Sequence, residues 1–198
     1  MPHADVLVPS LAPPLASAAA PPPKRDEASR PVTPALAALV AEIDGACADR
    51  AMRDRTVAAL ENAAARADLL TPEQRVPRDG CYARHPIYSD PAGRFTIVAI
   101  VWGCGQFSPI HAHHTWCAYA VHHNALEETL YEWDSESSAA QPVRTEVRSP
   151  CYGCYAHAGL DQIHRLGNSG AEPAISIHVY GVERERVGTH VNRVVQIG

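Results

Sequence analysis

The stretch Gly105-Gln106-Phe107-Ser108-Pro109-Ile110-His111-Ala112-His113 places two histidines two residues apart in a segment with the character of a strand. Side chains alternate between the two faces of a strand, so both imidazoles point the same way. Two unpaired histidines on one face of an apolar strand are costly to bury, and a metal ion would satisfy both. Further along, His164 is expected on a partner strand, where a third imidazole would leave coordination positions open for substrate and oxygen. The spacing therefore predicts a metal site formed by His111, His113 and His164.

Short apolar runs surround this stretch and predict an all-β fold. They follow Asp79-Gly80 and are separated by clusters of Gly, Pro, Asn, Asp and Ser, as in a sandwich or barrel. The expected strands cover residues 95–102, 111–121, 126–133, 142–147, 151–156, 174–180 and 191–197, besides the one that carries His164. We therefore expect a β-barrel domain over residues 79–198.

The residues before the barrel predict helices. Thr33-Pro34 is a suitable helix start, with Thr as N-cap and Pro at the first helical position. An amphipathic rhythm follows at Leu36, Leu39, Val40 and Ile43, and a second one runs over residues 53–70 up to Thr71-Pro72. These helices are rich in alanine and only modestly apolar, so residues 32–78 are expected to pack on the barrel rather than to fold alone.

Composition limits the remaining possibilities. Eight of the 17 prolines fall in residues 1–31, which predicts a disordered Pro/Ala-rich tail. The formal net charge of −5 argues against a nucleic-acid partner, and the chain has no apolar run long enough to span a membrane. The first residues lack the features of an export signal, so we expect a cytoplasmic monomer whose six cysteines are not paired. Cys151 and Cys154 form a lone Cys-x-x-Cys, which is a weak signal for a zinc or redox role.

The wider pattern resembles a known family. Gly-x5-His-x-His and His-x3-Asn resemble the two cupin motifs, but the stretch after His113 lacks the glutamate ligand of the first motif. A cupin with three neutral ligands resembles the thiol dioxygenase family, whose best-known member is cysteine dioxygenase. The likeness covers about half of the chain and is carried by Tyr82-Ala83-Arg84, Val101-Trp102-Gly103, His111-Ala112-His113, Leu126-Glu127-Glu128-Thr129-Leu130-Tyr131, Ile163-His164-Arg165 and Ser176-Ile177-His178-Val179-Tyr180. It implies a cupin (jelly-roll) β-barrel with an N-terminal helical segment, an Fe(II) cofactor and O2 as co-substrate.

Three neutral ligands leave the charge of Fe(II) uncompensated, which favours an anionic ligand such as a thiolate. Ser176, His178 and Tyr180 alternate along one expected strand and so share a face. The resemblance implies that Tyr180 contacts the reacting end of the substrate and that His178 and Ser176 orient it. The alternative is an alternating strand with a polar outer face.

Two further site assignments rest on the resemblance. Arg84, with Tyr82 beside it, stands where the family binds the substrate carboxylate, and a guanidinium offers bidentate geometry for that purpose; the alternative is a solvated arginine on a loop. Cys117 lies near the position of a cysteine that cross-links to the active-site tyrosine in the mammalian enzyme. The spacing from His113 is one residue shorter here, and a Cys117–Tyr180 thioether is a hypothesis.

These features predict a dioxygenase that converts a small thiol carboxylate, with L-cysteine first, to its sulfinate. Tyr180 is followed by Gly181, as in the bacterial mercapto-acid branch, and Arg184 or Arg186 could bind a second carboxylate. The alternatives are therefore 3-mercaptopropionate and mercaptosuccinate. Rivals of another class are a non-catalytic metal-binding cupin that senses a ligand, and a zinc- or manganese-dependent cupin isomerase or epimerase. Trp102 and Trp116 are expected to be packing residues.

Overall fold

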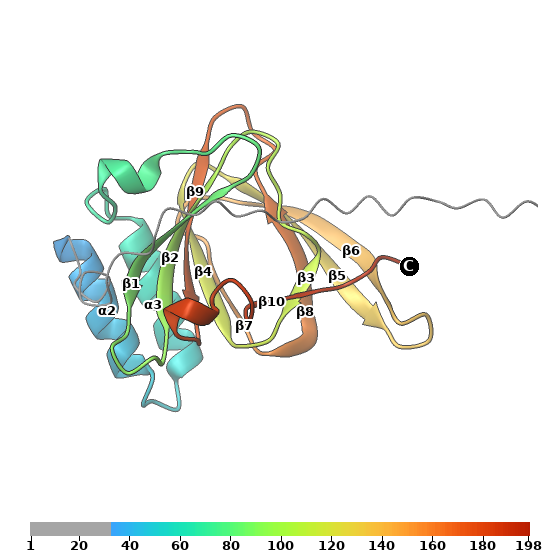
Figure 1. The fold of residues 1–198 in the computed structure, drawn as a ribbon, viewed down its shortest axis with the longest axis horizontal. Coiled ribbons are helices and arrows are strands. Elements are labelled where there is room, and N and C mark those ends of the chain that lie inside the picture. Colours follow the sequence, from blue (N-terminus) through green and yellow to red (C-terminus); the bar gives the residue numbers. More distant parts are fainter. Residues whose placement is uncertain (1–32) are drawn as a thin grey trace, which may run out of the picture.

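Two five-stranded antiparallel sheets enclose the interior of the protein. The computed structural model describes residues 33–198, and the tail expected at residues 1–31 lies outside them. The strand orders are β1-β2-β9-β4-β7 and β10-β3-β8-β5-β6. Figure 1 shows the sheets facing each other with the helices on one side. The expectation of a mainly β, cupin-type fold is confirmed.

The first sheet, β1-β2-β9-β4-β7, supplies one wall of the interior. Its strands are β1 (Ala83–Ser89), β2 (Thr96–Trp102), β9 (Ala174–Tyr180), β4 (Cys117–His123) and β7 (Gly153–Ala156). Every residue of β2 and β9 is buried. Both strands are covered on two faces, which explains why they read as continuous apolar runs.

The second sheet supplies the opposite wall. Its strands are β10 (Asn192–Val194), β3 (His111–His113), β8 (Gly159–Gly167), β5 (Leu126–Asp134) and β6 (Ala139–Arg148). Residues of β6 are mostly exposed because this strand lies at the edge of the sheet. The expected strand over residues 191–197 is wrong in length, since β10 ends at Val194.

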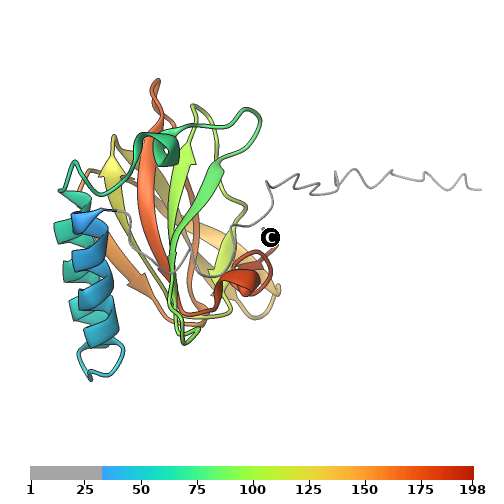
Figure 2. The same ribbon diagram turned by 60° about the vertical axis from the view of Figure 1, so that its left-hand side comes forward.

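Helices α2 (Pro34–Ala46) and α3 (Met52–Ala64) lie side by side against the outer face of the first sheet (Figure 2). Apolar side chains of both helices join residues of β2, β4 and β9 in one buried cluster, which includes Leu36, Leu60, Ile97 and Ile177. The Thr33 hydroxyl accepts a hydrogen bond from the Leu36 N–H at 3.1 Å, as expected of an N-cap. The helices are therefore part of the hydrophobic core. Among the described residues, no helix is long and apolar enough to cross a membrane.

Two further expected elements differ from the structure in their bounds. The second helix ends at Ala64 rather than near residue 70, and Thr71 instead caps the short 3₁₀ helix η1 (Pro72–Arg75) through a capping box with Gln74. The single strand over residues 111–121 is two strands, β3 and β4, that belong to different sheets. Arg84 lies within β1, opposite Ile100, and not on a loop.

The crossover between β3 and β4 is held by hydrogen bonds to distant backbone. His114 N–H donates to the Val191 carbonyl at 2.9 Å, and the Thr115 hydroxyl donates to the Gly181 carbonyl at 2.9 Å. A Cβ at Gly181 would lie 2.1 Å from Nε1 of Trp116, so this position needs glycine. The chain can thus pass between the sheets directly after the histidine pair.

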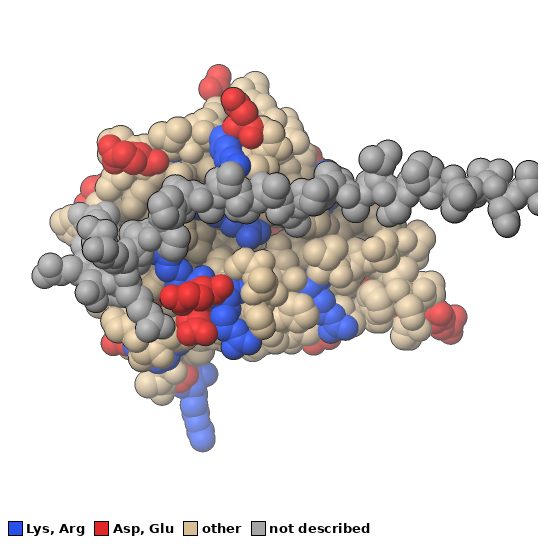
Figure 3. Space-filling model, viewed as in Figure 1, with Lys and Arg blue, Asp and Glu red and all other residues tan. Residues whose placement is uncertain are grey.

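Basic and acidic side chains both occur on the face seen in Figure 3. The short 3₁₀ helix η2 (Arg184–Arg186) carries Arg184 and Arg186 and follows β9.

Candidate metal centre and substrate pocket

Three histidines from two neighbouring strands meet in the interior. His111 pairs directly with His164 of β8, and His113 lies on the same short strand as His111. The three residues are 6%, 3% and 8% exposed for His111, His113 and His164. Their ring centroids are 4.6 to 5.2 Å apart, and one ligand atom from each lies within 4.8 Å of the others. The structure thus brings together the three ligands that the sequence suggested.

Burial keeps His111 and His113 neutral. Desolvation, followed by the nearby His164, lowers the pKa of His111 to about 3 and that of His113 to about 2. A neutral imidazole has a free lone pair and is the form that binds a metal ion.

Hydrogen bonds orient two of the three rings. His111 Nδ1 donates to the Pro109 carbonyl at 2.9 Å, and His164 Nδ1 donates to the Glu128 carboxylate at 2.7 Å. Nε2 of His164 and Nδ1 of His113 are buried without a protein partner. An ion bound among the rings would give such atoms a partner, so the residues fit a metal ion.

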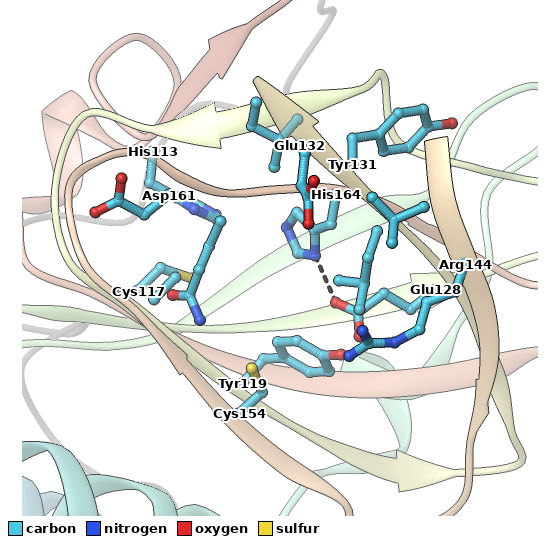
Figure 4. Close-up of a pocket in the computed structure, with 15 residues that line it drawn as sticks. His113, Cys117, Tyr119, Glu128, Tyr131, Glu132, Arg144, Cys154, Asp161 and His164 are labelled. Atoms are coloured by element: carbon cyan, nitrogen blue, oxygen red, sulfur yellow. Dashed lines mark hydrogen bonds and ion pairs between the residues drawn. The ribbon is translucent and has the colours of Figure 1, made fainter. Parts of the chain in front are cut away.

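Glu128 is a site residue that the sequence analysis missed. Its carboxylate is 2% exposed, receives the hydrogen bond from His164 (Figure 4) and contacts Arg148 Nε at 2.7 Å. Burial raises the pKa of Glu128, but the hydrogen bond from His164 and the charge of Arg148 outweigh it and hold the pKa below its ordinary value. The sequence of β5 could have indicated this residue, because side chains two residues apart lie on the same face of a strand, and Glu128 therefore shares the inward face with Leu126.

The facing wall carries the residues expected to act on the substrate. Trp102 Nε1 donates to Ser176 Oγ at 2.9 Å, and Ser176 Oγ lies 2.8 Å from His178 Nε2. The His178 ring stacks on Tyr180 with centroids 5.6 Å apart. Burial lowers the pKa of His178 well below its ordinary value and raises that of Tyr180, so the imidazole is neutral and the phenol keeps its proton. Trp102 therefore does more than pack: it holds Ser176.

One small pocket joins these groups. It has a volume of about 20 Å³, and its lining includes the three histidines together with His178, Tyr180, Cys117, Tyr82 and Arg84. Arg84 Nη2 donates to the Tyr82 hydroxyl at 2.9 Å, and its guanidinium lies 5.2 Å from the centre of that ring. Ser176 is not part of the lining, but it contacts His178, which is. Among the described residues, the lining includes neither Arg184 nor Arg186.

Cys117 and Tyr180 lie directly opposite each other on the paired strands β4 and β9. They are 3% and 5% exposed, and both line the pocket. Burial raises the pKa of the Cys117 thiol, which keeps it protonated at neutral pH. Cys151 and Cys154 are both unpaired thiols, and Cys151 is exposed.

Two antiparallel sheets around a buried three-histidine group define this protein as a cupin with a candidate metal centre. The sequence profile of the family described as "Cysteine dioxygenase type I" matches residues 81–187. The chain belongs to this cysteine dioxygenase family.

Curated relatives agree with the profile over part of their length. Cysteine dioxygenase type 1 of Danio rerio is 33% identical over 92 residues, which cover 44% of this chain and 45% of the relative. The enzyme of Homo sapiens is 32% identical over 91 residues, with the same coverage of 44% and 45%. The matched region thus spans less than half of these relatives.

Two solved structures show a distant likeness. A protein of Thermus thermophilus aligns with a TM-score of 0.44 at 18% identity, covering 57% of this chain and 96% of its own. A Klebsiella pneumoniae protein with a double-stranded β-helix domain aligns with a TM-score of 0.45 at 18% identity, covering 60% and 87%.

Proposed function

We propose that the protein is an iron-dependent thiol dioxygenase that oxidises a small thiol carboxylate, with L-cysteine as the first candidate. The observation that carries the proposal is the composition of the pocket. Three buried histidines share the pocket with an arginine and a tyrosine, and among the described residues its lining includes no carboxylate. Membership of the cysteine dioxygenase family supports the same reaction class.

His111, His113 and His164 would hold the iron. Because a histidine ligand is neutral when it binds a metal, a bound Fe(II) would keep its charge available to an anionic ligand and would favour the thiolate form of the substrate. The ferrous ion, when bound, would couple the oxidation of the thiolate to the reduction of dioxygen. In the balanced reaction RS⁻ and O2 give RSO2⁻, so both oxygen atoms form bonds to sulfur.

Arg84 would bind the substrate carboxylate. Within residues 33–198 no Asp or Glu forms an ion pair with Arg84, so none of the described carboxylates neutralises its charge. The Tyr82 hydroxyl accepts from one nitrogen and so fixes the guanidinium plane at the pocket. A planar guanidinium with free N–H groups binds a carboxylate in bidentate fashion.

Tyr180 would donate a hydrogen bond to the reacting end of the substrate or to oxygen. Its phenol stays protonated because burial raises its pKa. The Trp102 N–H occupies one lone pair of Ser176, whose own hydrogen is then free for His178 Nε2. In that arrangement the hydrogen of the neutral imidazole is on Nδ1, and the His178 ring stays fixed beside Tyr180.

A thioether between Cys117 and Tyr180 is part of the proposal. Forming the C–S bond removes one hydrogen from the thiol and one from the ring, and dioxygen would be the oxidant. Their position opposite each other on paired strands supports it. Peptide mass analysis after turnover should find the pair joined with the loss of two hydrogen atoms, and two unmodified peptides would contradict it.

The test of the reaction is oxygen uptake by iron-loaded protein with L-cysteine, 3-mercaptopropionate or mercaptosuccinate. We expect uptake with L-cysteine and formation of its sulfinate. Arg84→Ala should raise KM for the carboxylate substrate about 100-fold, equivalent to about 2.7 kcal/mol. Preference for either mercapto acid would reassign the substrate, and no uptake with any of the three would refute the dioxygenase.

A further inference from the structure

A second, larger cavity reaches the same histidines from the other side of the protein. This rear cavity has a volume of about 250 Å³. Its inner end is formed by His113, Cys117 and His164, which also line the small pocket that holds Arg84. The two spaces therefore meet at the candidate metal centre.

The sheet topology explains why two approaches exist. The small pocket opens where β1 and β10 end their sheets, and its lining includes Arg84 and Asn192. The rear cavity opens at the opposite edges, between β7 and β6, and its lining includes Cys154, Ala156 and Val143. At each opening the edge strands of the two sheets do not pair with each other, so the interior is not closed there by strand hydrogen bonds.

The two spaces differ in size and charge. The small pocket has a volume of only about 20 Å³, so it has no space for dioxygen beside a thiol carboxylate bound at Arg84. At the mouth of the rear cavity stand the exposed acids Glu132 and Asp161, and the one basic residue in the lining, Arg144, pairs with Glu146. This mouth repels an anion and has no effect on a neutral molecule.

The interior of the rear cavity can hold a small molecule. Much of its wall consists of thiol and aromatic groups from Cys117, Tyr119 and Cys154 (Figure 4), and the aliphatic side chain of Ile163 is also in the lining. The Tyr119 side chain is 2% exposed, and its hydroxyl is buried with no protein partner.

We propose that the rear cavity is the route by which dioxygen, a small neutral molecule, reaches the metal centre while the thiol carboxylate occupies the Arg84 side. This inference builds on the proposed function, because it assigns the two substrates of that reaction to separate entrances. The acidic mouth adds selectivity, since it keeps the anionic substrate out of the path that dioxygen uses.

Nitric oxide, a diatomic ligand of ferrous iron, is a suitable probe. Its association rate with the iron-loaded, substrate-saturated protein is measured by stopped-flow absorbance for Val143→Trp and Asp161→Trp, both at the exposed mouth. We expect each to lower the rate about tenfold, equivalent to about 1.4 kcal/mol on the entry barrier. The matched control is Val147→Trp, which lies on the same strand, is 70% exposed and is not in the cavity lining.

Unchanged nitric oxide rates in both mouth variants would overturn the rear route, and so would an equal loss in Val147→Trp. Far-ultraviolet circular dichroism confirms that each variant is folded before its rate is used. If the mouth variants slow nitric oxide but no thiol is oxidised, the route stands and the dioxygenase proposal fails. If thiols are oxidised while the rates stay unchanged, the dioxygenase stands and only the route fails.

Discussion

The two faces of the sheet β1-β2-β9-β4-β7 differ in chemistry although they share the same strands. Along β9, Ile175, Ile177 and Val179 point to the helices and join the apolar cluster there. Ser176, His178 and Tyr180 alternate with them and point into the barrel. The outward side chains of this strand thus contribute to the apolar core, while the inward ones are those assigned to the proposed reaction.

The inner face can carry polar groups because they have partners. Ser176 is fully buried and contacts both Trp102 and His178. The outer face depends less on such partners, because most of its contacts with α2 and α3 are between apolar side chains. A substitution at an outward residue of β9 should therefore lower mainly the stability of the fold, whereas one at the neighbouring inward residue should lower mainly the catalytic rate.

The largest effect on stability is expected on the outer face, for Ile177→Ala. Ile177 is fully buried against the helices, so its loss should lower the free energy of unfolding by about 3 kcal/mol. Urea unfolding measures this effect, and kcat of the folded variant should stay at the wild-type value. A large fall in kcat without loss of stability would contradict the division between the two faces.

Glu128→Gln tests the opposite wall of the interior. The carboxylate fixes His164, so its loss should weaken the binding of ferrous iron at the proposed metal site about 10- to 100-fold, or about 1.4 to 2.7 kcal/mol. Competition with a chelator measures the affinity without any turnover. The matched control is Glu127→Gln, the next residue of β5, which faces away. Equal losses in the two variants would show that Glu128 does not act through His164.

His178 should make the stability of the metal-free protein depend on pH. Burial, with smaller effects of His164 and Arg84, lowers the pKa of His178 in the folded state, whereas the unfolded chain takes up the proton near pH 6.5. Stability therefore falls as the pH drops below about 6.5, by about 1.4 kcal/mol per pH unit for this group. Ile177, on the outer face, contributes equally at every pH.

Urea unfolding between pH 7.5 and pH 5 checks this expectation in wild type and His178→Phe. The phenyl ring can take the place of the imidazole between Tyr119 and Tyr180, on which the His178 ring stacks. We expect a shallower pH dependence in the variant. Identical slopes would mean that His178 accepts its proton in the folded protein.

The sequence predicted those parts of the fold that depend on local periodicity. The bounds of β9 were predicted as 174–180, and the His-x-His spacing predicted two ligands on one strand. The strand over 111–121 was wrong because the residues between His113 and Cys117 carry no Gly or Pro to mark a turn. That crossover depends on long-range bonds to Val191 and Gly181, which a local pattern does not contain.

The site was predicted less fully than the fold. The histidines and Tyr180 stand in short motifs, whereas Glu128 and Trp102 act through partners far along the chain, His164 and Ser176. A buried acid on an otherwise apolar strand face indicates that a partner must exist, but it does not say which residue it is. Only the packed sheets bring these pairs together.

The smallest effect is expected for Trp102→Phe, which removes one hydrogen bond from the inner face. The indole N–H holds Ser176 at 2.9 Å, and the loss of such a bond costs about 1 kcal/mol. Because Phe keeps much of the stacking on Tyr82, the main consequence should be a freer Ser176–His178 pair and a several-fold lower kcat with little change in KM. Trp116→Phe is the matched control, since Trp116 stacks on Tyr155 among the contacts of the outer face. If both variants lowered kcat equally, Trp102 would be a packing residue like Trp116, and the difference between the two faces would not extend to their tryptophans.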